Sequence, residues 1–374
     1  MANKTARLGD LATYINGYAF KPADWGNTGL PIIRIQDLTG NSYQLNRYDG
    51  EYPERIEVND GDVLISWSAS LGVYVWQRGK ALLNQHIFKV VFDKLPVNKD
   101  YFVFAVEHKL AEMESKTHGA TMKHIVKKDF DGTTIPYPPI EKQAEIAGHL
   151  RRITSLIDRQ TEQLLLLDQL VKSRFIELFG DYDLTHPQES WVTIKEIGTV
   201  VGGATPKTDH DEYWGGSYRW ITPAELDADS GYIYDSVRKL TKAGVESCSL
   251  QEMPVGTVIL SSRAPIGKVA IAGNTFYCNQ GFKNIICKEG ITPRYLYTVL
   301  LLNVEYLNSL GRGATFKEIS KGIVESIRIP VPSMELQEQF AAFVEQTDKS
   351  KLAVQKGLQE LEILKKSLMQ QYFG

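Results

Sequence analysis

The sequence predicts an α+β protein in which two globular α/β domains are separated by two long helices that pair as an antiparallel coiled coil. Two observations lead to this fold class: one segment of the chain is repeated, and both copies carry apolar residues in alternating steps of three and four. The repeat gives the fold an internal pseudo-twofold relation. The predicted boundaries are a globular domain at 1–138, a helix at 139–180, a second globular domain at 181–332 and a second helix at 333–374.

The repeat is clearest in the second part of each half. Residues 119–180 align without a gap on 313–374, an offset of 194 residues. GATMK at 119 recurs as GATFK, and IPYPPIEKQ at 135 recurs as IPVPSMELQ. Upstream the similarity weakens but keeps its order, because GDVLISWSASLG at 61 parallels GTVILSSRAPIG at 256. Since the globular parts have diverged most, we expect the helices to do one job twice and the domains to do different jobs.

A heptad seam runs along each predicted helix. In the first helix the seam is interrupted by Gln160 and Arg174, and in the second it includes Thr347, Lys351 and Lys365. The apolar seam positions are Ile146, Leu150, Ile153, Ile157, Leu164, Leu167, Val171 and Leu178, then Phe340, Val344, Val354, Leu358, Leu361, Leu368 and Tyr372. Two such helices bury both seams most simply by pairing antiparallel, with a domain at each end. The alternative is a long amphipathic helix packed on its own domain.

The globular domains combine short β-like runs with a single helical stretch each, which is typical of α+β or α/β folds. The strand-like runs are 62–66, 87–92, 257–261 and 269–272, and the helical stretches are 101–114 and 293–310. Polar groups suited to contact with base edges stand where two of the strands end. These positions are Trp67 and Ser68 in the first domain, and Ser262 and Arg263 in the second.

Paired amides follow the same order in both domains. Asn84–Gln85 and Asn279–Gln280 carry the donor and acceptor pattern that reads adenine in a major groove, and the Arg263 guanidinium suits guanine. The alternative for each amide pair is a turn whose side chains bond to the protein itself. The candidate DNA-binding set also includes Lys21, Arg34, Thr205, Lys207, Thr222 and Lys283.

Two loops, HGATMKH at 118 and RGATFKE at 312, each combine a glycine, a hydroxyl and a lysine. Backbone N–H groups exposed by the glycine suit phosphate binding, together with Thr121 and Lys123 in the first loop and Thr315 and Lys317 in the second. The alternative is that each loop locks its domain onto the following helix.

Composition limits the class of protein. The 374 residues, 43% hydrophobic and 23% charged, are typical of a soluble globular protein of two or three domains. The three cysteines provide neither a disulfide framework nor a zinc site. The first residues lack an apolar targeting segment, and no run approaches a membrane span, so we expect a cytoplasmic protein. A net charge of −3 argues against non-specific coating of nucleic acid, unless a partner neutralises the phosphates.

Several segments of the second domain occur in a specific order. They are GGATPKTDHDEYWGGSYRWITPAEL at 202–226, VILSSRAPIGKVAIAGNTFYCNQGFKNI at 258–285, GATF, and IPVPSMELQEQFA. In this order they resemble the recurring segments of the specificity subunits of type I restriction-modification systems, and the duplicated layout extends the resemblance to the whole chain. The first domain departs from that pattern, with NGYAFKPADWGN, SWSASLG and NQHIFK in place of the TP, YWGG and RA-x-IG forms.

The resemblance implies a non-catalytic subunit whose two target recognition domains each read one half of an asymmetric, bipartite site in double-stranded DNA. It further implies that the paired helices set the spacer and dock two modification (methyltransferase) subunits, with restriction (translocase/endonuclease) subunits joining outside. S-adenosylmethionine, ATP and magnesium are expected on those partners, and no cofactor or metal is expected on this chain. The sequence contains no NPPY or NPPF motif, Gly-rich cofactor loop or P-loop. Two alternatives stay open: a methyltransferase or nuclease with unrecognised motifs, and a coiled-coil scaffold whose domains bind proteins.

Overall fold

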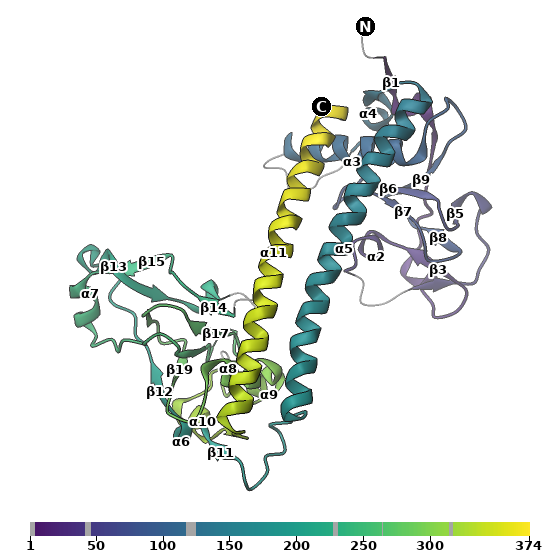
Figure 1. Cartoon of the computed structure of the whole chain (residues 1–374). Helices are drawn as coiled ribbons and strands as arrows, with labels where there is room; N and C mark the ends of the chain where they lie inside the picture. The colour runs from purple at the N-terminus through teal and green to yellow at the C-terminus, as the bar shows by residue number, and fades with distance from the viewer. Residues whose placement is uncertain (1–3, 42–45, 117–124, 227–230, 264, 314–316) are drawn as a thin grey trace. The chain divides into compact units, whose positions relative to one another are not determined.

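The computed structural model describes residues 4–41, 46–116, 125–226, 231–263, 265–313 and 317–374. The chain forms two compact units, and each unit takes part of both long helices (Figure 1). The first unit contains residues 1–164 and 353–374, and the second contains 165–352. Within the described residues, no helix is both long enough and apolar enough to cross a membrane.

The first unit contains two four-stranded sheets and a two-stranded ribbon. One sheet is antiparallel throughout and has the order β2 (Thr13–Asn16), β9 (Ile87–Val91), β6 (Val63–Ser66), β7 (Gly72–Val75). The other has the order β4 (Arg47–Tyr48), β3 (Leu30–Ile33), β8 (Ala81–Leu83), β5 (Glu57–Val58), and its β3 and β8 are parallel. The ribbon pairs β1 (Thr5–Arg7) with β10 (Thr134–Pro136). The helices of this domain are α1 (Leu8–Leu11), α2 (Ile35–Leu38), α3 (Lys99–Lys116) and α4 (Lys127–Gly132), with 3-10 turns η1 (Pro22–Asp24) and η2 (Glu54–Ile56).

The second unit repeats this plan, but its two sheets have five and three strands instead of four and four. Its larger sheet has the order β12 (Gly198–Gly202), β19 (Lys283–Cys287), β16 (Val258–Leu260), β17 (Val269–Ala272), β14 (Tyr232–Ile233). Its smaller sheet has the order β15 (Arg238–Leu240), β13 (Trp214–Ile221), β18 (Tyr277–Cys278), with β13 and β18 parallel. The ribbon pairs β11 (Val192–Thr193) with β20 (Arg328–Ile329). The remaining elements are α6 (Ile194–Ile197), η3 (Asp211–Tyr213), η4 (Pro223–Glu225), α7 (Lys242–Ser247), α8 (Pro293–Leu302), α9 (Val304–Ser309) and α10 (Lys321–Ser326).

The long helices α5 (Ile140–Phe179) and α11 (Met334–Phe373) contain 40 residues each, or roughly 60 Å at 1.5 Å per residue. Within each unit, α5 and α11 run in opposite directions. In the first unit His149 Nδ1 lies 3.5 Å from Tyr372 Oη, and in the second Asp168 forms an ion pair with Lys351. The predicted seam positions are buried or half-buried. The predicted antiparallel coiled coil is therefore confirmed.

The C-terminal end of each long helix packs on the domain of the other repeat. Phe373, at the end of α11, is buried with its ring centroid 5.2 Å from that of Tyr101 in α3. Phe179, at the end of α5, lies 5.0 Å from Tyr295 in α8. Each domain core is therefore closed by the start of one long helix and the end of the other.

Side-chain hydrogen bonds at this junction recur at the offset of 194 residues. The Tyr101 hydroxyl donates to the Pro136 carbonyl, and the Tyr295 hydroxyl donates to the Pro330 carbonyl, both at 2.9 Å. Burial raises the pKa of both tyrosines, which keeps both groups protonated as donors.

A buried glutamine fixes the beginning of each long helix. Gln143 Oε1 accepts the Asn98 N–H at 2.9 Å, while its Nε2 donates to the Pro138 carbonyl at 2.8 Å. Gln337 repeats both bonds with the Thr292 N–H at 2.8 Å and the Pro332 carbonyl at 2.9 Å. The glutamines in IEKQ and MELQ therefore hold each helix start against its own domain.

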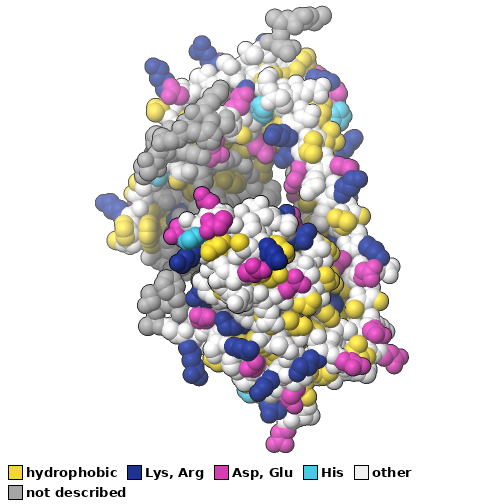
Figure 2. All heavy atoms as spheres, turned by 90° about the vertical axis from the view of Figure 1, so that its left-hand side faces the viewer, with side chains coloured by type: hydrophobic (Ala, Val, Ile, Leu, Met, Phe, Trp, Pro, Cys, Tyr) yellow, Lys and Arg dark blue, Asp and Glu magenta, His cyan; other side chains and the backbone are white. Residues whose placement is uncertain are grey.

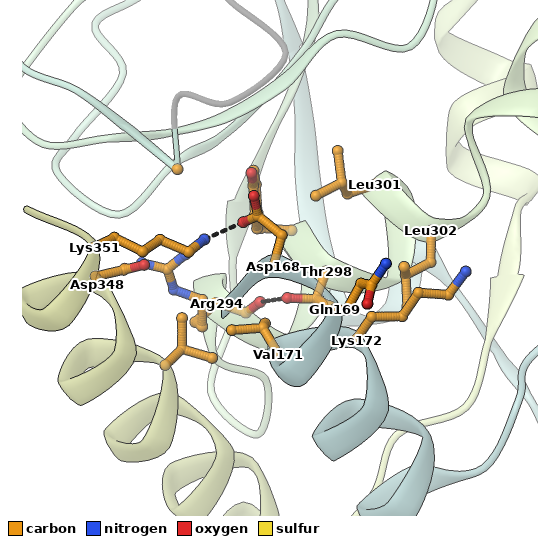
Figure 3. A pocket seen from close by; sticks show the side chains of 13 residues that line it. Asp168, Gln169, Val171, Lys172, Arg294, Thr298, Leu301, Leu302, Asp348 and Lys351 are labelled. Atoms are coloured by element: carbon orange, nitrogen blue, oxygen red, sulfur yellow. Dashed lines mark hydrogen bonds and ion pairs between the residues drawn. The ribbon is translucent and has the colours of Figure 1, made fainter. Parts of the chain in front are cut away.

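One position of the domain helices carries opposite charges in the two copies. Asp100 in α3 forms an ion pair with Arg151 of α5, whereas Arg294 in α8 pairs with Asp348 of α11 at 3.0 Å. In the second unit this pair borders a hollow of about 410 Å³ between α5, α8 and α11, which the Lys351–Asp168 pair also lines (Figure 3). In each copy, the charge on the domain helix is therefore opposite to the charge of its partner on the long helix.

The helical stretch predicted at 293–310 is two helices, α8 and α9, rather than one. The break falls at Asn303, whose side-chain amide donates to the Val299 carbonyl and whose Oδ1 accepts the Leu184 N–H. An asparagine that bonds to nearby backbone competes with the helical pattern, which explains the interruption.

Candidate nucleic-acid interface

The Asn-Gln pairs follow the parallel strand of the smaller sheet in both domains. The Asn84 N–H donates to the Ile33 carbonyl at 3.2 Å, and the Asn279 N–H donates to the Ile221 carbonyl at 3.1 Å. Both asparagines thus leave β8 or β18 beside the end of the neighbouring parallel strand. Carboxyl ends of parallel strands meet at one edge, so the residues after both strands lie together.

Two more segments converge on each Asn-Gln turn through backbone hydrogen bonds. The Trp67 N–H donates to the His86 carbonyl at 3.3 Å, and the Ser262 N–H donates to the Gly281 carbonyl at 2.7 Å. The glycine-containing loops contact the same turns, because the Tyr18 N–H donates to the Leu83 carbonyl and the Ala204 N–H donates to the Cys278 carbonyl. We call the resulting surface the loop edge: residues 17–21, 33–34, 66–68 and 84–88 in the first domain, and 203–207, 221–222, 261–263 and 279–283 in the second.

A glycine is required at the same point of both loop edges. A Cβ built on Gly17 would collide with the backbone of Asn84, and one on Gly203 would collide with the backbone of Cys278 and Asn279. Close approach of two backbones needs a residue without a Cβ. The glycines in INGY and VGGA therefore hold each loop against its turn.

Aromatic side chains dominate the loop edge of the first domain. The Trp67 ring stacks on Phe88, with centroids 5.5 Å apart and planes 23° apart, and meets the His86 ring edge-on at 5.0 Å. Ile125, Val126 and Lys127 complete a hollow of about 210 Å³ beside this stack. This region presents apolar and aromatic surface.

The polar candidates of the first domain are partly engaged with the protein itself. Asn84 Oδ1 accepts the Gln85 N–H at 2.9 Å, so Asn84 makes the turn that was the alternative for it, while the Gln85 side chain is exposed. Arg34 Nε lies 3.4 Å from the buried carboxylate of Asp37. Lys21 is exposed and Ser68 is half-buried.

Hydroxyls and amides dominate the turn of the second domain. The Thr205 hydroxyl donates to Gln280 Oε1 at 2.6 Å, and Asn279 Oδ1 accepts the Gly281 N–H at 2.8 Å. Thr222 bonds through its N–H and hydroxyl to Glu225 Oε1, at 2.9 and 3.1 Å. The Lys207 side chain is exposed. The structure thus brings Thr205, Asn279 and Gln280 together.

Charged residues form the other side of this loop edge. Lys283 Nζ lies 3.1 Å from Glu318 Oε1 and 3.3 Å from Ser262 Oγ, and Arg263 Nη1 lies 3.7 Å from Glu318 Oε2. Ser262 is fully buried, so its hydroxyl lies beneath the surface rather than on it. Arg263 is the cation of this pair that faces solvent more, with 36% of its side chain exposed against 14% for Lys283.

Of the candidates in the GAT loops, Thr121, Lys123 and Thr315 lie outside the described residues. Lys317 is exposed, and the neighbouring Glu318 pairs through its backbone with Arg312 at the other side of the loop. The residues that sequence reasoning missed are Glu318, Glu225 and Phe88. Glu318 ends the segment RGATFKE, but nothing in the sequence around it indicates that it pairs with Arg263 and Lys283.

The strand register shows which residues of the two domains are equivalent at this site. Ser66 faces Ile87, and Ser261 faces Phe282, so Phe88 is the counterpart of Lys283. Trp67 and Phe88 therefore occupy the positions of Ser262 and Lys283. The same site in the scaffold carries a ring stack in one domain and an ion-paired lysine in the other.

Within the described part of the chain, no group of three or more His, Cys, Asp or Glu residues is placed to hold a metal ion. Burial raises the pKa of Cys278 and of Cys287 to about 12, which keeps both thiols protonated. On the face shown in Figure 2, basic and acidic side chains are interspersed rather than gathered in one basic patch.

Known proteins share both the sequence pattern and this fold. The MjaIX specificity subunit of a type I restriction enzyme from Methanocaldococcus jannaschii is 43% identical over 185 residues, which cover 48% of this chain and 43% of that protein. The chain thus spans less than half the length of that relative. The MjaVIII specificity subunit of the same organism is 24% identical over 396 residues, covering 98% of this chain and 91% of that one.

The solved S subunit of a type I restriction-modification system from M. genitalium shares the fold, with a TM-score of 0.60 at 14% identity over 99% of this chain and 96% of the other. The model of the type I restriction modification DNA specificity domain matches twice, at residues 2–167 and 189–363. These two matches follow the internal repeat and confirm the family resemblance seen in the sequence. The chain belongs to the family of type I restriction-modification DNA specificity domains, and it carries two copies of that domain.

Proposed function

We propose that this chain is the DNA-sequence-recognition subunit of a type I restriction-modification complex, and that each domain reads one half of a bipartite, asymmetric site in double-stranded DNA. The observation that carries this proposal is the loop edge, which the chain builds twice on equivalent backbone hydrogen bonds but fills with different side chains. Because the backbone frame is the same in both domains while the side chains on it differ, each domain can recognise a different half-site.

The side chains at the two edges match the chemistry of base recognition. Exposed amides such as Gln85 and Gln280 offer a donor and an acceptor together, and Arg263 offers the fork that suits guanine O6 and N7. The aromatic surface around Trp67 suits an apolar group such as the thymine methyl. The exposed Lys21, Lys207 and Lys317 suit phosphates, which position the duplex without reading sequence.

The proposed complex contains two modification subunits, which bind S-adenosylmethionine, and restriction subunits, which bind ATP and magnesium, in the cytoplasm. This chain supplies recognition and no catalytic group. The net charge of −3 and the interspersed charges on the face shown in Figure 2 support this division, since a chain with little net attraction for DNA needs partners that neutralise phosphates.

Sequencing of methylated bases in cells with and without this gene tests the proposal. We expect one bipartite motif with an unmethylated spacer to disappear when the gene is deleted. An unchanged methylome, together with no sequence-dependent footprint of the assembled complex, would favour the protein-binding scaffold. Methylation by the purified chain alone would favour an enzyme.

We further propose that the paired helices set the spacer length. Inserting four residues after Leu164 lengthens α5 by about 6 Å at 1.5 Å per residue. With base pairs about 3.4 Å apart, the spacer of the methylated motif should grow by roughly one to two base pairs while both half-sites stay the same. Full activity on an unchanged spacer would contradict this role, and altered half-sites would place the helices in the reading surface.

A further inference from the structure

Neither cation at the charged end of the second loop edge is free. Arg263 and Lys283 share a single carboxylate, that of Glu318, through its two different oxygens at 3.7 and 3.1 Å. Among the described residues, no other acidic side chain lies within ion-pairing distance of either cation. The Arg263 guanidinium, which suits guanine, therefore pairs with a carboxylate of its own chain.

The backbone on both sides of Glu318 fixes the position of this carboxylate. The Glu318 N–H donates to the Arg312 carbonyl at 3.0 Å, and its carbonyl accepts the Arg312 N–H at 3.1 Å. The following N–H, of Ile319, donates to the Ser262 carbonyl at 2.9 Å. Glu318 is thus tied to the strand end that carries Arg263, and its charge stays at the loop edge whether or not the ion pairs are intact.

The two ion pairs differ in how easily they exchange. Lys283 is only 14% exposed and has a second partner in Ser262 Oγ, so it stays with the protein. Arg263 has the longer contact, and 36% of its side chain and 38% of that of Glu318 are exposed. Exposed ion pairs contribute little to stability, so an incoming acceptor can replace Glu318 at Arg263.

We propose that Glu318 is a specificity-determining residue of the second domain, which makes Arg263 available to a matching base but not to a phosphate. This inference rests on the proposed function. A guanine edge is neutral and offers two acceptors, so Arg263 can move to it without a like charge approaching Glu318. A phosphate that approaches Arg263 brings a negative charge toward a fixed carboxylate, which disfavours it. Glu318 therefore weakens non-specific binding more than specific binding.

The test measures equilibrium binding of the full chain in complex with its modification subunits. Two duplexes are compared over a range of salt concentrations: one with the methylated motif, and one with the second half-site scrambled. Glu318→Gln removes the charge and keeps the shape. We expect the variant to bind the scrambled duplex about two- to five-fold more tightly, the effect of one exposed charge pair, and to bind the intact motif with nearly unchanged affinity. The salt dependence on the scrambled duplex should steepen by roughly 0.9 for each further phosphate that the variant neutralises.

Two further variants separate this role from a structural one. Glu325→Gln makes the same change of net charge at a carboxylate that pairs with Lys321 at 3.7 Å within α10, and should leave discrimination unchanged. Glu318→Asp keeps the charge but shortens the reach, so discrimination should be retained. If Glu318→Gln does not fold, Glu318→Met removes the same charge in the same series.

Several outcomes would overturn the inference. If Glu318→Gln weakens binding to the intact motif and leaves the scrambled duplex unaffected, the carboxylate accepts a hydrogen bond from a base instead. If Glu318→Gln behaves like Glu325→Gln, or if Glu318→Asp loses as much discrimination as Glu318→Gln, the charge does not set specificity. A wild-type complex that binds both duplexes equally would refute the proposed function itself, and with it this inference.

Discussion

The two loop edges differ in their side chains, whereas the two helix junctions repeat their buried tyrosines and glutamines. At equivalent strand positions the first edge has the Trp67–Phe88 stack and the second has Ser262 with Lys283. At the junctions, Tyr101 and Tyr295 make the same bond to a proline carbonyl. The difference lies in what holds each region together: backbone hydrogen bonds frame the loop edges, while buried side chains make the junctions.

This contrast explains how one fold can hold two different reading surfaces. A backbone frame tolerates substitution of nearly any side chain that does not collide with it, apart from the glycines at closest approach. A junction made by buried side chains loses a partner with almost any substitution. Mutations should therefore separate the two regions, with large effects on stability at the junctions and effects on DNA selectivity at the edges.

The largest effect should come from the aromatic residues that end the long helices. Phe373→Ala and Phe179→Ala each remove a buried ring that closes a domain core, which should cost about 3–5 kcal/mol in the free energy of unfolding. Calorimetry should show earlier unfolding of the unit that carries the substitution. Ile363→Ala, at an exposed position of α11, serves as the control and should change stability by less than about 0.5 kcal/mol. Equal effects from all three variants would show that the helix ends do not close the cores.

The buried glutamines should come next. Gln143→Leu and Gln337→Leu each leave a backbone N–H and a proline carbonyl without their partner, which should cost about 1–3 kcal/mol of stability in either unit. Thr205→Val breaks a side-chain bond at the second loop edge instead and should change stability by less than about 0.5 kcal/mol. Denaturant unfolding measures both effects, and a Thr205→Val variant as unstable as Gln337→Leu would contradict the contrast between the regions.

Substitutions at the loop edges should change selectivity, one half-site at a time. Arg263→Ala should weaken binding of the cognate duplex by about 1–3 kcal/mol if Arg263 contacts a guanine, and should relax only the half-site read by the second domain. Trp67→Ala should relax only the other half-site, by a similar or smaller amount. Methylome sequencing of each variant reports the motif, and a change in the opposite half-site would refute the separate assignment.

The sequence predicted the repeated architecture well because periodicity alone encodes it. Heptad spacing gives the length of α5 and α11, and short β-like runs located β6, β9, β16 and β17 to within one or two residues. The docking of the helix ends was not predicted, since Phe175, Phe179 and Phe373 lie outside the heptad seam. Phe179 meets Tyr295 and Phe373 meets Tyr101, and both partners are distant in sequence, so no local spacing of apolar residues indicates these contacts.

The sequence predicted the turns of the candidate site but not the ion pairs between its side chains. Asn84, Asn279 and the strand ends do converge, yet the ion pairs of Glu318 depend on which residues face each other across strands. Matching the letters FK in NQHIFK and NQGFK would place Lys89 opposite Lys283. Strand pairing places Phe88 there and points Lys89 away, so that its ammonium donates to the Glu57 carbonyl of the other sheet. A shift of one residue in an alignment moves a side chain to the opposite face of the sheet. Equivalent positions can therefore be assigned only when the strand register is known.

The smallest effect should come from an exposed ion pair at the junction of the first unit. Lys365 Nζ lies 3.4 Å from Glu107 Oε1, with 24% and 45% of their side chains exposed. At the offset of 194 residues the second unit has Val171 and Leu301, which both line the hollow beside α8. Because exposed pairs contribute about 0.2–1 kcal/mol, Glu107→Leu and Lys365→Val should each cost less than about 1 kcal/mol of stability. The double variant, which gives the first unit the apolar contact of the second, should regain the loss. A coupling energy above about 2 kcal/mol in this double-mutant cycle would show that the pair is a desolvated determinant of which helix end binds which domain.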